Sequence, residues 1–400
     1  MFNYKGPSLL GLFFYNETVF QRQILVFPSY NGYISSAMND SMDRVINNRP
    51  RVAIATGKTR KDTVAQALDL VRDDISNALK GDVLIKPNFL SSTRHLASTQ
   101  AEAVEPVLDL LSGYTGGEIV IGEGGSRSTS EAFDRFGYRD LELRYGVNLR
   151  DLNRDGYMKS FELVTETGGI HAIRYSDTAA EAGTIISVAV AKTHDTATVT
   201  LSLKNMMGCL KRVERPRMHG IQLGSTAENA IDMLWKAIER HDNVIKLISG
   251  IVFFVVHAAR SVERSISRGE QPGLFNQVKA MSENLARLAT VLKPAVSVID
   301  AFDAMEGNGP GGGKPVPMRC AVAGTDAIAC DAVMAYMMGF DPMRIGYLAL
   351  AHERGLGVAE ISQIEVTGED PAALRRRFIP HENYPVQSRW YENRSAVTVP

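Results

Sequence analysis

The chain has 400 residues, of which 44% are hydrophobic and 22% are charged, a composition typical of a globular protein with a large core. Its 44 Lys and Arg residues almost balance its 45 Asp and Glu residues, which gives a net charge of -1 and argues against a general nucleic-acid binder. The cysteines, Cys209, Cys320 and Cys330, include no C-x-x-C pair. A disulfide framework, a zinc ribbon and an iron–sulfur cluster are therefore disfavoured, and a reducing, cytoplasmic location is favoured.

The first 45 residues are interpreted as an N-terminal extension, with Met38 and Met42 as alternative starts of the working protein. Their longest uninterrupted apolar run, 9–15, is short for a signal peptide, and no clear cleavage site follows it. A second apolar run, 245–256, is too short for a bilayer, which needs about 20 apolar residues. We therefore expect no membrane span.

From residue 51 onward, short apolar strands alternate with helical patterns. The predicted strands are 51–56, 82–86 and 118–121, and the predicted helices are 62–79, 101–111 and a helix that begins near Ser128. Ser128 and Glu131 have the spacing of a capping box. This βαβ order is typical of a parallel sheet with helices on its faces.

The rest of the chain continues the alternation with two departures. Residues 146–176 indicate shorter strands with a hairpin turn at Gly168 and Gly169, and residues 241–292 indicate a helical insertion. The other predicted elements are strands 184–191, 198–203, 295–299, 319–323 and 364–367, and helices 227–240, 327–338 and 345–354. We expect an α/β fold over 46–370, with a mostly parallel sheet flanked by helices, a second smaller lobe and an irregular tail over 371–400.

Ligands of parallel sheets bind at the carboxyl ends of the strands, so the polar residues there are candidate site residues. Lys86 and Asn88 follow strand 82–86, and they offer a point charge and a two-way hydrogen-bonding group. Lys192 and His194 come directly after the apolar strand 184–191, and their spacing of two places them on one face. An ammonium group binds anions and an imidazole exchanges a proton near neutral pH, so the pair predicts an anion site.

A second pair of polar residues follows the alternating segment 198–203. Lys204 and Asn205 are predicted to return to the same edge, and His219 lies in the basic loop after them. The two histidines, His194 and His219, do not by themselves make a zinc site, which needs three or four ligands. The alternative for each of these residues alone is a solvated surface group.

Two glycine-rich loops also follow predicted strands. Gly122, Gly124 and Gly125 would let backbone N–H groups approach an anion, although Glu123 would repel a phosphate, and a plain tight turn is the alternative. The loop 307–313 is predicted to close over a ligand, with Asn308 among its contacts, or else to be a flexible connector. Nearby, Asp300 and Glu306 are candidate ligands of a divalent metal ion.

An ordered series of motifs resembles the family catalogued as domain of unknown function 362. The motifs are Lys86-Pro-Asn88, Gly122-Glu-Gly124, Lys192-Thr-His194, Lys204-Asn205 with Gly208, His219, the segment 300–313, and Gly324-Thr-Asp326 with Asp331 and Gly339. The resemblance implies a cytoplasmic α/β protein of prokaryotic type, often of undetermined activity. Some members carry ferredoxin-like cysteine motifs, which this sequence lacks.

The residues favour an enzyme that acts on a small anionic substrate, a carboxylate or a phosphate, with or without a divalent metal. Lys192, His194 and Lys204 would carry acid–base chemistry of the isomerase, lyase or hydrolase type, because the sequence shows no Ser or Cys nucleophile elbow. The alternative is a non-catalytic protein that holds a cofactor, a metal or a redox partner at the same residues. A further alternative gives the segment 241–292 a role in homo-oligomer assembly.

Overall fold

The computed structural model describes residues 49–221, 233 and 272–392. The N-terminal extension, the predicted helix 227–240 apart from residue 233, and most of the predicted helical insertion lie outside these residues. The end of that insertion is a helix, α11, of 21 residues. Among the described helices, none combines the length and the apolar character that crossing a bilayer would require.

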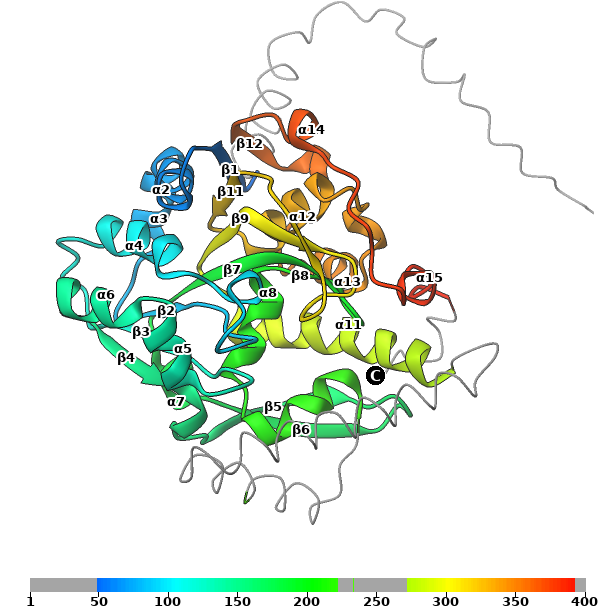
Figure 1. Cartoon of the computed structure of the whole chain (residues 1–400). Coiled ribbons are helices and arrows are strands. Elements are labelled where there is room, and N and C mark those ends of the chain that lie inside the picture. Colours follow the sequence, from blue (N-terminus) through cyan, green and yellow to red (C-terminus); the bar gives the residue numbers. More distant parts are fainter. Residues whose placement is uncertain (1–48, 222–232, 234–271, 393–400) are drawn as a thin grey trace, which may run out of the picture. The chain divides into compact units, whose positions relative to one another are not determined.

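The strands form one large sheet and one separate hairpin (Figure 1). The path through the large sheet is β12–β1–β11–β9–β7–β2–β3–β4, with β10 added to β9 and β8 added to β7. Neighbours on this path are parallel except at β11, which runs antiparallel to β1 and to β9. The strands are β1 (Arg51–Thr56), β2 (Val83–Lys86), β3 (Ile119–Glu123), β4 (Asn148–Asp151), β5 (Lys159–Val164), β6 (Ile170–Tyr175), β7 (Thr184–His194), β8 (Thr198–Thr200), β9 (Val296–Glu306), β10 (Lys314–Val316), β11 (Cys320–Gly324) and β12 (Glu365–Gly368).

Helices flank this sheet, which confirms the predicted α/β class with a mostly parallel sheet. The α-helices are α2 (Arg60–Leu70), α3 (Arg72–Ala78), α4 (Ala101–Leu110), α5 (Thr129–Arg135), α6 (Tyr138–Tyr145), α7 (Asp177–Glu181), α8 (Ser202–Asn205), α11 (Pro272–Leu292), α12 (Ala327–Met337), α13 (Gly346–Glu353), α14 (Pro371–Leu374) and α15 (Tyr384–Gln387). The 3-10 helices are η1 (His95–Ala97), η2 (Leu152–Arg154), η3 (Met206–Cys209), η4 (Arg212–His219), η5 (Pro342–Arg344) and η6 (Ile361–Gln363). Ser128 caps α5 by accepting a hydrogen bond from the Glu131 N–H, as the capping-box spacing predicts.

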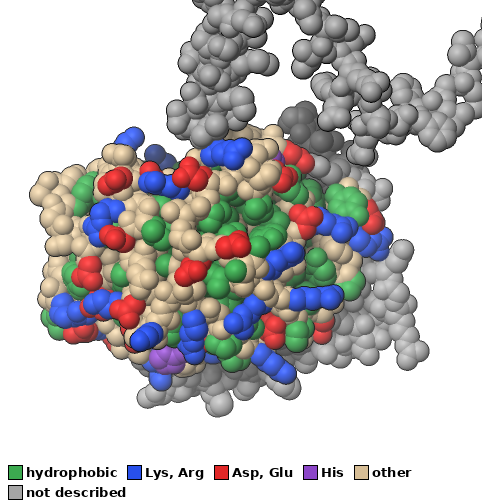
Figure 2. Space-filling view, turned by 90° about the horizontal axis from the view of Figure 1, so that it is seen from above, with side chains coloured by type: hydrophobic (Ala, Val, Ile, Leu, Met, Phe, Trp, Pro, Cys, Tyr) green, Lys and Arg blue, Asp and Glu red, His purple; other side chains and the backbone are tan. Residues whose placement is uncertain are grey.

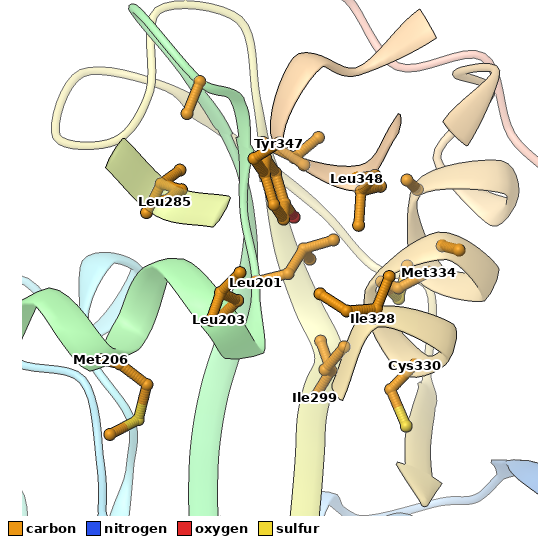
Figure 3. Packing of buried hydrophobic residues seen from close by; sticks show 14 of the residues in the cluster. Leu201, Leu203, Met206, Leu285, Ile299, Ile328, Cys330, Met334, Tyr347 and Leu348 are labelled. Atoms are coloured by element: carbon orange, nitrogen blue, oxygen red, sulfur yellow. The ribbon is translucent and has the colours of Figure 1, made fainter. Parts of the chain in front are cut away.

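The alternation of side chains along the strands builds a core on each face of the sheet. Val52 and Ile54 of β1 pack into one hydrophobic cluster, and Ala53 and Ala55 pack into the other. The first cluster lies under α8, α11, α12 and α13, and Figure 3 shows part of it, with labels on residues that include Leu201, Tyr347 and Leu348. The second cluster lies under α2, α4, α5 and α6. The side chains on both faces of the central strands are therefore buried from water.

The hairpin β5–β6 lies outside the large sheet, and its turn falls at the predicted glycines. Asn284 of α11 links this hairpin to the main helix layer, because its side chain accepts from the Val164 N–H at 2.8 Å and donates to the Val164 carbonyl oxygen at 2.8 Å. On the face that Figure 2 shows, acidic and basic side chains are interspersed, in keeping with the balanced charge of the sequence.

The structure corrects three details of the predicted elements. The helix predicted over 62–79 is two helices, because the buried Val71 adopts non-helical backbone angles between α2 and α3. Strand 295–299 continues to Glu306, because its second half pairs with β10 and with the end of β7. Strand 198–203 ends at Thr200, and the chain turns at once into α8.

Candidate functional site

The candidate site lies where β2 ends beside β7. The two strands are parallel, with Lys86 paired to Ser187, and β7 runs on for several residues past the end of β2. Lys192 therefore lies beyond Lys86 along the same edge, and the loop after β2 brings Asn88 next to it. The tight turn from β7 into β8 then leads to α8, which carries Lys204 and Asn205.

Two asparagines join two of the lysines into one hydrogen-bonded network. The Lys192 ammonium donates to Asn88 Oδ1 and to the Ala97 carbonyl oxygen, the latter at 2.8 Å. Asn88 Nδ2 donates to Asn205 Oδ1 at 3.1 Å, and the Lys86 ammonium donates to the same oxygen at 3.2 Å. The structure thus brings together Lys86, Asn88, Lys192 and Asn205, which lie up to 119 positions apart in the sequence.

Lys86 is the lysine of the site whose charge is compensated by direct contact. Its ammonium is fully buried and in contact with the Glu123 carboxylate, which is 2% exposed. Burial lowers the pKa of Lys86, and the carboxylate contact opposes that effect by favouring the charged form. Glu123, expected to repel a phosphate, is instead the counter-ion of Lys86 and also accepts from the Phe89 N–H.

Lys192 and Lys204 form no ion pair with any carboxylate of the described residues. Lys192 has only oxygen atoms of neutral groups as partners, and the Lys204 ammonium donates to the Met207 sulfur at 3.5 Å. Burial lowers the pKa of Lys192 to about 7, helped by the positive charges of Lys204 and Lys86. Burial likewise lowers the pKa of Lys204 to about 8, against the influence of Asp195.

His194 lies beside these lysines, but its ring is engaged by its own turn. The N–H groups of Thr196 and Ala197 donate to His194 Nδ1 at 3.0 and 3.2 Å. Asp195 Oδ1 lies 2.9 Å from the same nitrogen, a contact that would need a proton there. Burial and the nearby Lys204 lower the pKa of His194 to about 4, so the ring is neutral near pH 7, and the two N–H donors at Nδ1 assign its proton to Nε2.

His219 comes close to His194 without sharing a hydrogen bond with it. The two rings stack with centroids 6.2 Å apart, and Thr196 Oγ1 lies 3.2 Å from His219 Nδ1. Thr196 also donates to Asp195, so the turn 194–198 is tied together by short polar contacts. At its end, Thr198 has a φ of 67°, in the left-handed region that normally favours glycine.

Close packing explains the predicted glycines at and just after the end of β3. A Cβ on Gly122 would lie 2.7 Å from the Leu84 side chain, and a Cβ on Gly124 would lie 2.3 Å from the Gly208 carbonyl oxygen. Gly125 is buried, and its N–H donates to Thr129 Oγ1 at 3.1 Å. These contacts favour the turn interpretation of this segment over a phosphate-binding loop.

The second glycine-rich loop joins β9 to β10 and is held by contacts from several segments. Arg94 donates to the carbonyl oxygens of Gly311 and Gly313, and Thr193 Oγ1 donates to the Gly307 carbonyl oxygen at 2.8 Å. Asn308 Oδ1 accepts from the Glu382 N–H at 3.1 Å. The loop thus lies against the end of β7, but Asn308 bonds to the C-terminal segment.

Asp300 and Glu306 have separate partners. Asp300, buried in the middle of β9 and not at a strand end, accepts from Arg60 Nε at 2.8 Å. Glu306 accepts from the Ile379 N–H at 2.9 Å. Within residues 49–221, 233 and 272–392, no group of three or more His, Cys, Asp or Glu side chains is arranged to hold a metal ion. The described residues thus do not bring the two predicted metal ligands into a common set.

The family model described as domain of unknown function (DUF362) matches residues 83–336, more than half of the chain. The chain belongs to the DUF362 family. A curated relative, a thylakoid-associated protein of Synechocystis sp. (strain ATCC 27184 / PCC 6803 / Kazusa), is 23% identical over 280 residues, which are 68% of each chain. The match places the whole lysine and asparagine network inside the DUF362 region.

Two solved structures are weakly similar to this chain. The lactate racemase apoprotein from Thermoanaerobacterium thermosaccharolyticum has 16% identity and a TM-score of 0.30, over 42% of this chain and 40% of that one. A protein from Thermotoga maritima has 12% identity and a TM-score of 0.35, over 78% of this chain and 60% of that one. This chain therefore spans less than two thirds of either structure.

Three residues that support the site, Asp331, Asn383 and Gln387, were not among the predicted site residues. Asp331 of α12, inside the DUF362 match, accepts from the N–H groups of Ser202 and Leu203 at 2.7 and 3.1 Å, and so fixes the start of α8. Beyond the match, Gln387 donates to the His194 carbonyl oxygen at 2.8 Å and Asn383 donates to the Asp195 carbonyl oxygen at 2.8 Å. Asp331 belongs to the motif series that carries the family resemblance, whereas no sequence signal pointed to the C-terminal segment.

Proposed function

We propose that the protein is an enzyme that binds a small anionic substrate, a carboxylate or a phosphate, at Lys192 and Lys204. The observation that carries the proposal is that both ammonium groups are buried without an ion-paired carboxylate among the described residues. A buried charge is costly unless it is paired, and a bound anion would supply the missing partner. Lys86 differs because Glu123 already compensates it.

The same burial prepares these lysines for proton transfer. A general base works best when its pKa lies near the working pH, and burial brings the pKa of Lys192 to about 7. In its neutral form, Lys192 Nζ accepts a proton, and in its charged form it binds the anion. Asn88 holds this nitrogen in place by accepting its hydrogen bond. Lys204 stays charged to a higher pH, because its pKa is about 8, and so keeps the anion bound.

The proposal is tested by anion binding measured with isothermal titration calorimetry at pH 7. Inorganic phosphate and malonate serve as probes of the two substrate classes. We expect Lys192→Met and Lys204→Met each to weaken binding of the preferred probe at least tenfold, about 1.4 kcal/mol. Lys159→Met is the matched control, because Lys159 is an exposed lysine on β5. Unchanged affinity in both site variants would contradict the proposal.

A cytoplasmic location and the absence of a nucleic-acid partner belong to the same proposal. They are supported by the net charge of -1 and by three cysteines that are free and buried. Cell fractionation of the native protein tests the location. If the protein binds an anion but turns over no candidate substrate, the non-catalytic alternative is favoured.

A further inference from the structure

A buried hydroxyl group beside Lys192 has no hydrogen-bond partner. Thr200 is 5% exposed, and its Oγ1 is one of the few buried side-chain polar atoms without a partner in the part of the chain that the structure describes. Buried hydroxyl groups in proteins are nearly always hydrogen-bonded, so an exception requires an explanation. The unfilled partner position marks a place where a bound molecule would find a donor.

Thr200 is placed next to the candidate site by strand pairing. It lies directly opposite Lys192 in the antiparallel pair of β7 and β8. Residues directly opposite each other in such a pair project to the same face, with Cβ atoms about 4.5–5.5 Å apart. Four residues later, α8 carries Lys204. The unpartnered hydroxyl thus belongs to the segment that joins the two lysines without ion-paired carboxylates.

Three other buried hydroxyl groups near Thr200 have partners, which sets Thr200 apart from them. Thr193 Oγ1 donates to the Gly307 carbonyl oxygen at 2.8 Å, and Ser202 Oγ donates to Ser297 Oγ at 2.6 Å. Ser187 Oγ donates to the Ser202 carbonyl oxygen at 3.1 Å. The local fold therefore provides hydrogen-bond partners for these three hydroxyl groups but not for that of Thr200. A valine would fill the space of Thr200 without the cost of an unmade hydrogen bond.

We propose that Thr200 Oγ1 donates a hydrogen bond to an oxygen atom of the anion that Lys192 and Lys204 bind. This inference rests on the proposed function and deepens it, because it names a residue that would orient the bound oxyanion. A hydroxyl donor aimed at one oxygen fixes the orientation of a carboxylate or phosphate, which two point charges alone do not. Thr200 is thus a substrate-binding residue in the family region.

The test compares Thr200→Val, Thr200→Ser and Thr184→Val. Thr184 is the matched control, because it is a buried threonine at the opposite end of β7 whose Oγ1 donates to the Lys80 carbonyl oxygen at 2.9 Å. Thermal unfolding is measured without anion and with increasing inorganic phosphate or malonate. The unliganded stability and the anion-induced shift are read separately, because a structural hydroxyl and a ligand-binding hydroxyl affect them differently.

We expect Thr200→Val to match or exceed the wild-type midpoint without anion, while its affinity for the preferred probe falls about tenfold. Thr200→Ser should keep the affinity, and Thr184→Val should lose stability but keep the anion response. A less stable Thr200→Val protein with wild-type affinity would overturn this inference alone. If wild type responds to neither probe, or if Lys192→Met and Lys204→Met both respond as wild type does, the proposed function fails and this inference fails with it.

Discussion

Replacement of Lys192 by methionine is expected to change how the stability of the protein depends on pH. The wild-type ammonium is fully buried, and burial lowers its pKa from 10.5 to about 7. Between these two values the unfolded chain binds more protons than the folded chain, so stability rises with pH across the window from about 7 to about 10.5. Methionine has a similar length and carries no charge, so this contribution disappears.

The magnitude follows from the difference between the two pKa values. A lysine whose pKa falls from 10.5 to about 7 destabilises the fold by about 4–5 kcal/mol at low pH. Most of this cost is still present at pH 7 and most of it is absent at pH 10. The variant also loses the hydrogen bonds to Asn88 and Ala97, at a cost of about 1–3 kcal/mol for each group left unpartnered, but that loss does not depend on this titration.

The assay is urea unfolding at a series of pH values from 7 to 10. The stability of Lys192→Met minus that of wild type should fall by several kcal/mol across the series, whatever its value at pH 7. The exposed Lys159→Met is the control and should show no such fall. A difference between Lys192→Met and wild type that stays constant from pH 7 to pH 10 would show that the buried nitrogen carries no charge cost, and the reasoning would be refuted.

Three further substitutions test neighbouring parts of the site. Glu123→Gln leaves the buried Lys86 ammonium without its carboxylate and should cost about 3–5 kcal/mol in urea unfolding; a cost below about 1 kcal/mol would contradict the ion pair. Thr198→Gly relieves a φ of 67° and should raise stability by about 1 kcal/mol, whereas a loss would indicate that the hydroxyl or methyl group outweighs the backbone strain. Gly208→Ala places a Cβ 2.5 Å from Lys86 Nζ and should cost about 1–3 kcal/mol by displacing the ion pair; a neutral effect in thermal unfolding would mean that the lysine moves freely.

The fold class was predictable because alternation and strand–helix order are local properties of the sequence. The continuous apolar run of β1 is typical of a strand that is buried on both faces. Its alternate residues enter the two clusters, Val52 and Ile54 on one face and Ala53 and Ala55 on the other. The antiparallel direction of β11 was not predictable in this way, because it depends on which neighbours a strand finds in the folded sheet. The length of β9 was not predictable either, because its second half becomes a strand by pairing with β10 and β7.

The candidate site was predictable only as far as strand ends indicate it. Lys86 and Lys192 were found because parallel strands place their carboxyl ends along one edge. The role of Glu123 was not predictable. The sequence shows a carboxylate in a glycine-rich loop and gives no sign that its partner is a lysine 37 positions away. The C-terminal contacts of Asn383 and Gln387 span more than 180 positions, and no local pattern encodes them.

The environment of His194 shows why residue type alone does not assign a catalytic role. An ordinary histidine titrates near pH 6.5, which makes it the usual first candidate for acid–base chemistry. Here the turn donates two N–H groups to Nδ1, and burial with a nearby lysine lowers the pKa to about 4. A ring in that state is a weak base at neutral pH but offers a fixed N–H donor at Nε2. Burial brings the pKa of Lys192 to about 7, so under the proposed function the lysine, and not the histidine, would move the proton.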